Sequence, residues 1–358
     1  MKAFFVIRKF ESAYSLFFFD VGKYGVAGLV LLRSGIFGSE QCVAVFRKRV
    51  CLTSKKVRLM QLQSQSEVRP GSALAWFLAA RPKTLTAALI PVLTATALAY
   101  ADGTMRSQPA WLCVLFAALM QIAANFINDL FDFQKGTDRD DRLGPERACA
   151  RGWITPHAMK WGIGIVLVLA AVVGLGLLSY GGWTLIGIGV ACMIFAFLYT
   201  TLLSYMGCGD LLVWVFFGFV PVCGTYYVQS GTLTPSVWWL AAGIGLVTDT
   251  LLVLNNYRDR EQDAISGKRT LIVALGERFG SLFYLLQGVG GYVCVAFLAF
   301  YGYTWMAILP LFYLLPHWLT WRKMVQIHKG RALNRILGFT SRNMLTFALL
   351  IVLALVFG

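Results

Sequence analysis

Nine apolar stretches, each about the length of a bilayer-spanning helix, follow one another from Leu85 to the end of the chain. A helix needs about 20 apolar residues to cross the hydrocarbon core. Hydrophobic residues make up 58% of the 358 residues and charged residues 14%, whereas a soluble domain has about half and about a quarter. We therefore predict an all-α integral membrane protein with nine transmembrane helices, centred near Val92, Phe116, Val168, Met193, Gly218, Gly245, Tyr292, Leu311 and Leu349.

Basic residues are concentrated in alternate connections between these stretches. The connections after the second, sixth and eighth stretches each carry five or six Lys or Arg residues, whereas those on the other side carry only Arg106. The positive-inside rule then predicts that the loops after even-numbered stretches are cytoplasmic and that the C-terminus lies outside. The same distribution accounts for the formal charge of +15, so we exclude nucleic acid as a partner.

The first 70 residues differ from the rest, because they are basic and their apolar patches are interrupted by Asp20, Lys23 and Arg33. We divide the chain into this N-terminal extension, residues 1–70, and a membrane domain, residues 71–358. A signal peptide or an amphipathic anchor is one interpretation of the extension, but it lacks a small-residue cleavage site and an unbroken apolar core. The interpretation that we prefer begins the chain at Met60 and treats residues 1–59 as an over-extended reading frame without function.

Two apolar stretches end in clusters of Asn and Asp at helical spacing. The first cluster falls at i, i+3, i+4 and i+7 and the second at i, i+3 and i+7, so each shares one helix face. Carboxylates crowded on one face repel one another unless a cation lies among them, and Mg²⁺ is commonly held by a few carboxylates and by substrate phosphates. We therefore predict that Mg²⁺ and an anionic ligand bind at Asn125, Asn128, Asp129 and Asp132 and at Asn256, Asp259 and Asp263.

An isolated acidic loop is usually only a solvated helix end, and the repetition at two helix ends favours the functional interpretation here. Basic residues follow both clusters and could neutralise a diphosphate, although each could equally be a positive-inside anchor. Most aromatic residues are expected at the membrane interfaces, and a minority could stabilise a cation through their π faces. The basic residues concerned are Lys135, Arg139, Arg142 and Arg147 after the first cluster and Lys268 and Arg269 after the second.

Several motifs resemble the UbiA superfamily of intramembrane aromatic prenyltransferases. They are ARPKTL at residues 80–85, NDLFDFQKGTD at 128–138, DRLGPER at 141–147, and NNYRDREQD with GKRTL at 255–271. Together they are most similar to the branch that prenylates 1,4-dihydroxy-2-naphthoate in menaquinone synthesis. The resemblance covers residues 74–358, and it departs from the superfamily pattern NDxxDxxxD at Gly136, where Asp138 looks like the substitute.

The resemblance implies nine helices around a central cavity with Asp-rich cytoplasmic cap loops, in the cell (inner) membrane. It implies Mg²⁺ as cofactor, and prenyl diphosphate, an aromatic acid and membrane lipid as partners. Metal ligands would be Asp129, Asp132, Asp138, Asp259 and Asp263. Diphosphate would be bound by Lys83, Lys135, Arg139, Arg142, Arg147 and Lys268. Asn125, Asn128 and Asn256 would bind substrate, and Asp249 and Tyr199 would be catalytic.

Two places depart from what the resemblance leads us to expect. The segment YTTLLSYMGCGD after Tyr199 is short and lacks Pro, although Asp210 still matches the acidic position. Asp249 is an acid inside the sixth stretch, seven residues before Asn256, so we expect its side chain to point into the cavity and to activate the acceptor. The alternative is that Asp249, as a neutral acid, only hydrogen-bonds a neighbouring helix.

Other functions remain open at this point. The same scaffold could prenylate 4-hydroxybenzoate, homogentisate or haem. A transporter could also place carboxylates at a cytoplasmic opening, although transporter sites usually lie near the bilayer midplane at broken helices.

Overall fold

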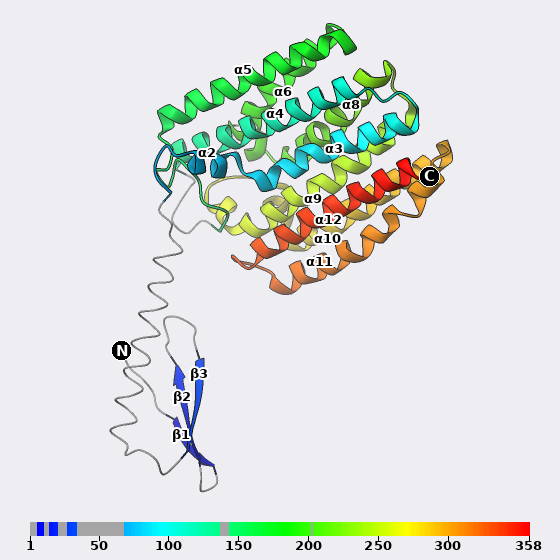
Figure 1. The fold of residues 1–358 in the computed structure, drawn as a ribbon. Coiled ribbons are helices and arrows are strands. Elements are labelled where there is room, and N and C mark those ends of the chain that lie inside the picture. The colour runs from blue at the N-terminus through cyan, green and yellow to red at the C-terminus, as the bar shows by residue number, and fades with distance from the viewer. Residues whose placement is uncertain (1–5, 11–13, 21–26, 34–67, 137–142, 202) are drawn as a thin grey trace. The chain divides into compact units, whose positions relative to one another are not determined.

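The structure is a computed structural model that describes residues 6–10, 14–20, 27–33, 68–136, 143–201 and 203–358. Side chains are described for the same ranges from residue 68 onward, except at positions 83, 200 and 204. The chain divides into two compact units, Met1–Val68 and Arg69–Gly358, and each is described by itself (Figure 1). The division at residue 70 drawn from composition stays a prediction.

The first unit contains a small antiparallel sheet that we did not expect from the sequence. Strands β1 (Val6–Phe10), β2 (Tyr14–Asp20) and β3 (Ala27–Arg33) lie in the order β1-β2-β3. Val6 pairs with Phe18, and Phe18 pairs in turn with Leu29. All further elements belong to the second unit.

The second unit begins with a short helix that leads into two long ones. Helix α2 (Ala73–Ala80) starts at Ser72, whose hydroxyl accepts a hydrogen bond from the Ala75 N–H, as helix-capping serines do. Arg81 has a left-handed φ of 51° and separates α2 from α3 (Pro82–Ala101), and Pro82 occupies the favourable first position of α3. Helix α4 (Ser107–Gln134) then carries the first polar cluster at its C-terminal end.

The middle of the unit is less regular. Helices α5 (Pro156–Gly181) and α6 (Thr184–Thr201) are followed by a turn, η1 (Leu203–Tyr205), and by one span that combines α7 (Gly209–Trp214), η2 (Val215–Phe219) and α8 (Val220–Ser230). Element η2 is a turn of π-helix, and such turns often occur at functional sites. Pro221 lies just beyond it and cannot donate a backbone hydrogen bond.

The last third contains four helices. Helix α9 (Pro235–Ile265) carries the second polar cluster, and α10 (Leu271–Ala296) follows it. Short turns η3 (Phe297–Tyr301), η4 (Thr304–Ala307) and η5 (Pro310–Tyr313) lead to α11 (Leu314–Ile327) and then to α12 (Leu333–Val356). The long helices run roughly side by side, with α12 next to α3 although the two are far apart in the sequence (Figure 1).

Seven helical segments of the described chain are long and apolar enough to cross a membrane, two fewer than the nine spans predicted. The apolar part of α6, Thr184–Tyr199, falls short of the usual length. The segment predicted around Leu311 consists of short turns and the 14-residue α11. Pro310 begins η5 and Pro316 lies in the first turn of α11, where a missing backbone N–H is tolerated. A multi-pass helical membrane protein is therefore confirmed, and the count of nine stays a prediction.

The main core lies where α3, α8, α9 and α12 meet. Its members are apolar and almost fully buried, among them Leu98, Leu240, Ile244 and Phe347. Helices α9 and α10 approach closely because glycines face each other, so that a Cβ on Gly243 would lie 2.8 Å from the Gly291 carbonyl oxygen. This packing fixes α9, and with it the second polar cluster.

Candidate active site

A large cavity lies between the helices from α3 to α9. Its volume is about 520 Å³, and most of its wall is apolar. Helix α4 lines it from Cys113 to Asn128, a length of about 22 Å at 1.5 Å per residue. Polar groups in its wall include the amides of Asn128 on α4 and Asn255 on α9 and the hydroxyl of Tyr199 on α6. A long apolar molecule with one polar end fits such a cavity.

Asp129 belongs to the first cluster and follows Asn128 in the sequence, but its side chain does not line the cavity. Its side chain is only 1% exposed, and its two oxygens accept hydrogen bonds from the backbone N–H groups of Ala148 and Cys149, both at 2.8 Å. Asp129 thus holds the segment that follows α4. Its role as a metal ligand stays a prediction.

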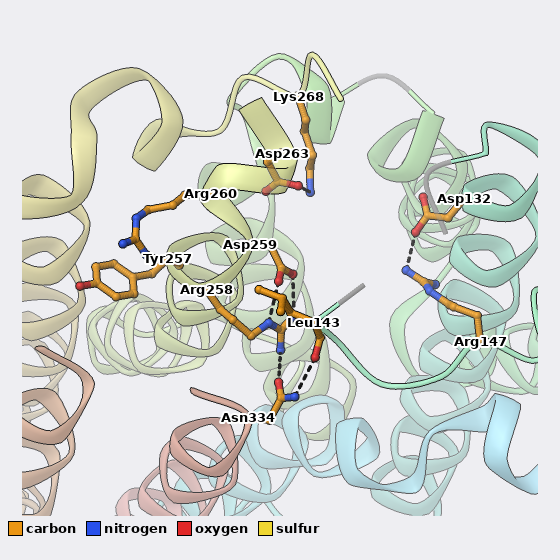
Figure 2. A network of polar contacts seen from close by, with 10 residues as sticks. All are labelled: Asp132, Leu143, Arg147, Tyr257, Arg258, Asp259, Arg260, Asp263, Lys268 and Asn334. Atoms are coloured by element: carbon orange, nitrogen blue, oxygen red, sulfur yellow. Dashed lines mark hydrogen bonds and ion pairs between the residues drawn. The ribbon is translucent and has the colours of Figure 1, made fainter. Parts of the chain in front are cut away.

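Asp132, one turn further along α4, forms an ion pair with Arg147. The Arg147 side chain is 7% exposed and that of Asp132 20%, so solvent screens the pair only partly. Figure 2 shows the Arg147 guanidinium directed at the Asp132 carboxylate. The two motifs that contain these residues, and that are similar to the superfamily, therefore meet in space.

Asn125 is the member of the first cluster that lies farthest from the C-terminal end of α4. Its amide nitrogen donates to the Ala80 carbonyl at 2.8 Å and to the Thr84 hydroxyl at 2.9 Å, and its amide oxygen accepts from Gln121 at 3.2 Å. Asn125 thus ties α4 to the junction of α2 and α3. Its predicted contact with substrate stays untested.

The second cluster lies at the C-terminal end of α9. Arg258 donates two hydrogen bonds to Asp259, at 2.7 and 2.5 Å, and its own side chain is 2% exposed. Asp263 lies 3.7 Å from the Lys268 ammonium, while its Oδ2 is buried without a hydrogen-bond partner among the described residues. A buried carboxylate oxygen of this kind is costly unless a donor or a cation satisfies it.

The pKa of Lys135 depends on charges near both clusters. Burial lowers the pKa of the Lys135 ammonium, nearby Asp132 opposes that effect, and the positive charge of Lys268 adds to it. Lys135 also donates to the Thr201 carbonyl at 2.8 Å and lies 4.0 Å from the centre of the Tyr205 ring. Figure 2 shows Asp132 and Arg147 on one side of the site and Asp259, Asp263 and Lys268 on the other.

A second, much smaller recess lies beside the large cavity. Its volume is about 10 Å³, enough for about one water molecule. Tyr199 lines both spaces, and the recess is otherwise lined by Asp210, Asn256, Lys268 and Thr270 with three other residues. Asp210 is 6% exposed, and its Oδ1 has no hydrogen-bond partner among the described residues. Asn256, predicted to bind substrate, therefore faces this recess rather than the cavity.

Asp249 faces α10 and not the cavity, so the expected direction of its side chain is wrong. It is fully buried, and its Oδ2 accepts a hydrogen bond from Gln287 on α10 at 2.7 Å. The cavity is lined by Thr248 and Asn255, which share one face of α9, whereas Asp249 is turned away by about 100°. The geometry favours the alternative of a hydrogen bond between helices, and a catalytic role stays a prediction.

Four of the predicted diphosphate and metal ligands lie outside the described side chains. They are Lys83, whose backbone begins α3, and Asp138, Arg139 and Arg142. Among the side chains that are described, no three from His, Cys, Asp and Glu converge as a metal site. Two acids, Asp129 and Asp132, lie on α4, and two others, Asp259 and Asp263, lie on α9. Mg²⁺ is usually bound by one or two carboxylates together with water and phosphate oxygens, so the oxygen donors present fit this metal.

Sequence reasoning missed two residues of this region. Asn255 lines the cavity, whereas only its neighbour Asn256 was chosen, because helical spacing to Asp259 was the criterion. Asn334 on α12 hydrogen-bonds to Arg258 at 2.8 Å, and no motif pointed to it. The Asn-Asn pair could have shown that two adjacent faces of α9 are polar.

The family of the chain follows from its sequence as well as from its fold. The UbiA prenyltransferase family matches residues 88–341, which include both polar clusters and most of the cavity wall. The chain therefore belongs to the UbiA prenyltransferase family, as the motifs led us to expect. It is a multi-pass membrane enzyme of the prenyltransferase class.

Two relatives are similar to the chain in sequence, and a solved structure is similar to it in fold. The 1,4-dihydroxy-2-naphthoate octaprenyltransferase of Haemophilus influenzae is 36% identical over 243 residues, which are 64% of this chain and 79% of the relative. The protein of the same name from Mycobacterium tuberculosis is 34% identical over 290 residues, 79% of this chain and 97% of the relative. A UbiA homologue from Archaeoglobus fulgidus bound to DMAPP and Mg²⁺ shares the fold, with a TM-score of 0.52 and 13% identity over 77% of this chain and 98% of that structure.

Proposed function

We propose that this chain transfers a polyprenyl group from polyprenyl diphosphate to 1,4-dihydroxy-2-naphthoate, with release of diphosphate and CO₂, to give the demethylmenaquinone skeleton. Relatives that bear the name of this activity align over most of their own length. The cavity gives the most direct physical support, because it is long and apolar and has amide groups of Asn128 and Asn255 in its wall. A polyprenyl tail and an aromatic ring both require such a dry space.

Mg²⁺ fits the carboxylates of the two clusters. Asp132, Asp259 and Asp263 would hold it, with Asp129 and Asp138 as further ligands proposed from the sequence. When bound, the metal draws electron density toward the departing diphosphate. The buried oxygen of Asp263, which has no hydrogen-bond partner among the described residues, supports this assignment, as does the solved homologue whose structure contains Mg²⁺.

Basic side chains around the clusters would bind the diphosphate. Arg147 and Lys268 already lie against Asp132 and Asp263, so each can neutralise an acid or be shared with an anion. The charge of Lys135 interacts with Asp132 and with Lys268, which pairs with Asp263, so Lys135 would act on the same group. Charge-assisted hydrogen bonds from these residues would hold the leaving group in place, and Lys83, Arg139 and Arg142 are proposed as further donors from the sequence.

The reaction begins when the bond between the prenyl C1 and the diphosphate oxygen breaks and the electron pair leaves with the diphosphate. The allylic cation then lies among aromatic side chains, whose π faces stabilise it in a space from which water is excluded. The ring carbon that bears the carboxylate attacks the cation. The bond to the carboxylate carbon then breaks, its electron pair returns to the ring, and CO₂ leaves. The aromatic residues in the wall are Phe116, Phe195, Tyr199, Phe216 and Phe217.

The orientation in the membrane belongs to the same proposal. Both clusters lie at ends of helices whose connections are rich in Lys and Arg, and by the positive-inside rule this supports a cytoplasmic position for them. The short α6 and the interrupted segment before α12 would complete nine membrane segments in the cell (inner) membrane.

A comparison of acceptors tests the proposal. Purified full-length chain is incubated with Mg²⁺, a radiolabelled polyprenyl diphosphate and, in separate reactions, 1,4-dihydroxy-2-naphthoate, 4-hydroxybenzoate, homogentisate or haem. We expect a labelled product only with the naphthoate. A labelled product formed only with another acceptor would show that the acceptor is not the naphthoate. Flux of substrate into liposomes without any product would contradict the enzymatic function and indicate a transporter.

A further inference from the structure

Residues 143–149, here called the bridging segment, connect the two polar clusters. On the α4 side the segment is held twice, since Arg147 pairs with Asp132 and the N–H groups of Ala148 and Cys149 donate to Asp129. These contacts join its C-terminal half to the first cluster. They use two of the three carboxylates proposed there as metal ligands.

The other end of the bridging segment is held by a residue from the far end of the chain. Asn334, near the start of α12, donates its amide N–H to the Leu143 carbonyl at 2.7 Å. Its amide oxygen accepts from Arg258 at 2.8 Å, and Arg258 donates to both oxygens of Asp259. Figure 2 shows this line of contacts from Leu143 through Asn334 to Asp259.

We propose that Asn334 is a positioning residue. It holds the bridging segment, and with it Arg147, in a fixed position relative to Asp259. The inference rests on the proposed function in one respect, namely that Asp132 and Asp259 hold Mg²⁺ together with diphosphate. A side-chain amide suits this position, because it donates to a carbonyl and accepts from a guanidinium at once. Neither a carboxylate nor an apolar side chain can do both.

The chemistry explains why such a residue matters for catalysis. Arg258 is buried, and adjacent to Asp259 it can either neutralise that carboxylate or leave it to a cation. A second acceptor on the guanidinium fixes its plane and so fixes where the Asp259 oxygens lie. Asn334 also holds the Leu143 end of the segment whose Arg147 engages Asp132. A displacement at Asn334 would therefore alter both clusters.

The thiol of Cys149 provides a readout that does not depend on turnover. It is buried at 4% exposure and lies on the bridging segment, so maleimide reacts with it only when the segment opens. The rate is read by mass spectrometry of its peptide, in purified full-length protein in detergent. We expect Asn334→Leu, which removes both hydrogen bonds at similar volume, to label at least about fivefold faster than wild type. Asn334→Asp keeps the acceptor for Arg258 and loses the donor to Leu143, and should label faster as well.

Asn343 supplies a control on the same helix. It is buried, whereas Asn334 is exposed, and it donates both of its hydrogen bonds to α11, to the Pro316 carbonyl and the Thr320 hydroxyl. Asn343→Leu therefore also removes two hydrogen bonds from α12, and because neither bond involves the bridging segment, we expect Cys149 to label at the wild-type rate. Equal acceleration in Asn343→Leu and Asn334→Leu would overturn the proposal, since the effect would then be general loosening. Wild-type labelling in both Asn334 variants would overturn it too.

Added Mg²⁺ with geranyl diphosphate tests the link to the metal. We expect this mixture to slow Cys149 labelling in wild type, and Asn334→Leu to need at least about fivefold more Mg²⁺ for half of that protection. Protection at the same Mg²⁺ concentration in both proteins would overturn the coupling. Faster labelling in Asn334→Leu would support the positioning role even if Mg²⁺ with geranyl diphosphate protected Cys149 in neither protein. The absence of protection in both proteins would contradict the proposed metal site.

Discussion

At the scale of single residues, neighbouring acids on one helix have different tasks. Asp129 accepts hydrogen bonds from two backbone N–H groups, whereas Asp132 pairs with the side chain of Arg147. An acid that is satisfied by backbone donors is less available to a metal than an acid paired with a side chain that can move. This difference leads to separate predictions for the two residues.

Asp132→Asn is expected to lower kcat/KM by more than about tenfold, a loss of about 1.4 kcal/mol in transition-state stabilisation, because a carboxylate proposed to hold Mg²⁺ becomes a neutral amide. Expression should be unchanged. The measurement is product formation by purified protein over a range of Mg²⁺ concentrations. Retention of most of the activity would remove Asp132 from the proposed metal site.

Asp129→Asn is expected to act mainly on stability. An amide offers one acceptor where the carboxylate offers two, so one of the buried N–H groups of Ala148 and Cys149 loses its partner, which costs about 1 to 3 kcal/mol. The melting temperature in detergent should fall. An unchanged melting temperature together with lost turnover would show that Asp129 is a metal ligand after all.

Gln287 and Asp249 give a third test at this scale. Gln287→Leu leaves the buried Asp249 carboxyl without the one donor that it has among the described residues and should lower the melting temperature. Asp249→Asn preserves an acceptor for Gln287 and should keep most of the activity. Loss of turnover in Asp249→Asn at unchanged stability would restore the catalytic role.

At the scale of helices, the π-helical turn η2 packs directly on the backbone of α9. A Cβ on Gly218 would lie 2.7 Å from the Ala241 carbonyl oxygen and 2.8 Å from the Gly245 Cα, so there is no flexible side chain that could give way. We expect Gly218→Ala to cost about 1 to 3 kcal/mol in stability and to reduce activity, since Phe216 and Phe217 beside it line the cavity.

The matched control is Gly164→Ala on α5. A Cβ there would have no heavy atom within 4 Å, and the position does not line the cavity. Its melting temperature and activity should equal those of wild type. If both alanine variants behave alike, close packing of η2 on α9 is not what positions the cavity wall.

Helical periodicity explains which parts of this site could be predicted. Asn128 lines the cavity, and its predicted contact with substrate stays a prediction. The direction predicted for the Asp249 side chain was wrong, because spacing relates Asp249 to Asn256 but does not say which neighbour α9 presents to that face. Asn334 could not be found from spacing at all, since its contact with Arg258 joins positions 76 residues apart.

At the scale of the whole molecule, the interrupted segment before α12 shows the limit of hydropathy. Its composition matched a single span, whereas the structure divides it into short turns and the 14-residue α11. The small sheet in the first unit escaped notice because apolar patches of five to seven residues suit strands and helix fragments equally.

Removal of residues 1–59 tests the division of the chain. Every described residue of the cavity and of the two clusters lies in the second unit, so a protein that begins at Met60 should insert into the membrane and keep wild-type turnover. Membrane fractionation and product formation measure the two properties. A truncated protein that inserts but has no activity would show that the first unit contributes to function.

Release of CO₂ is the most direct test of the central claim. The purified chain is given 1,4-dihydroxy-2-naphthoate with a labelled carboxylate, a polyprenyl diphosphate and Mg²⁺, and both labelled CO₂ and prenylated product are counted. Attack at the carboxylated ring carbon predicts one CO₂ for each prenylated ring, and no release of CO₂ when the prenyl diphosphate or Mg²⁺ is omitted. A prenylated product that retains its carboxylate label would contradict the proposed reaction.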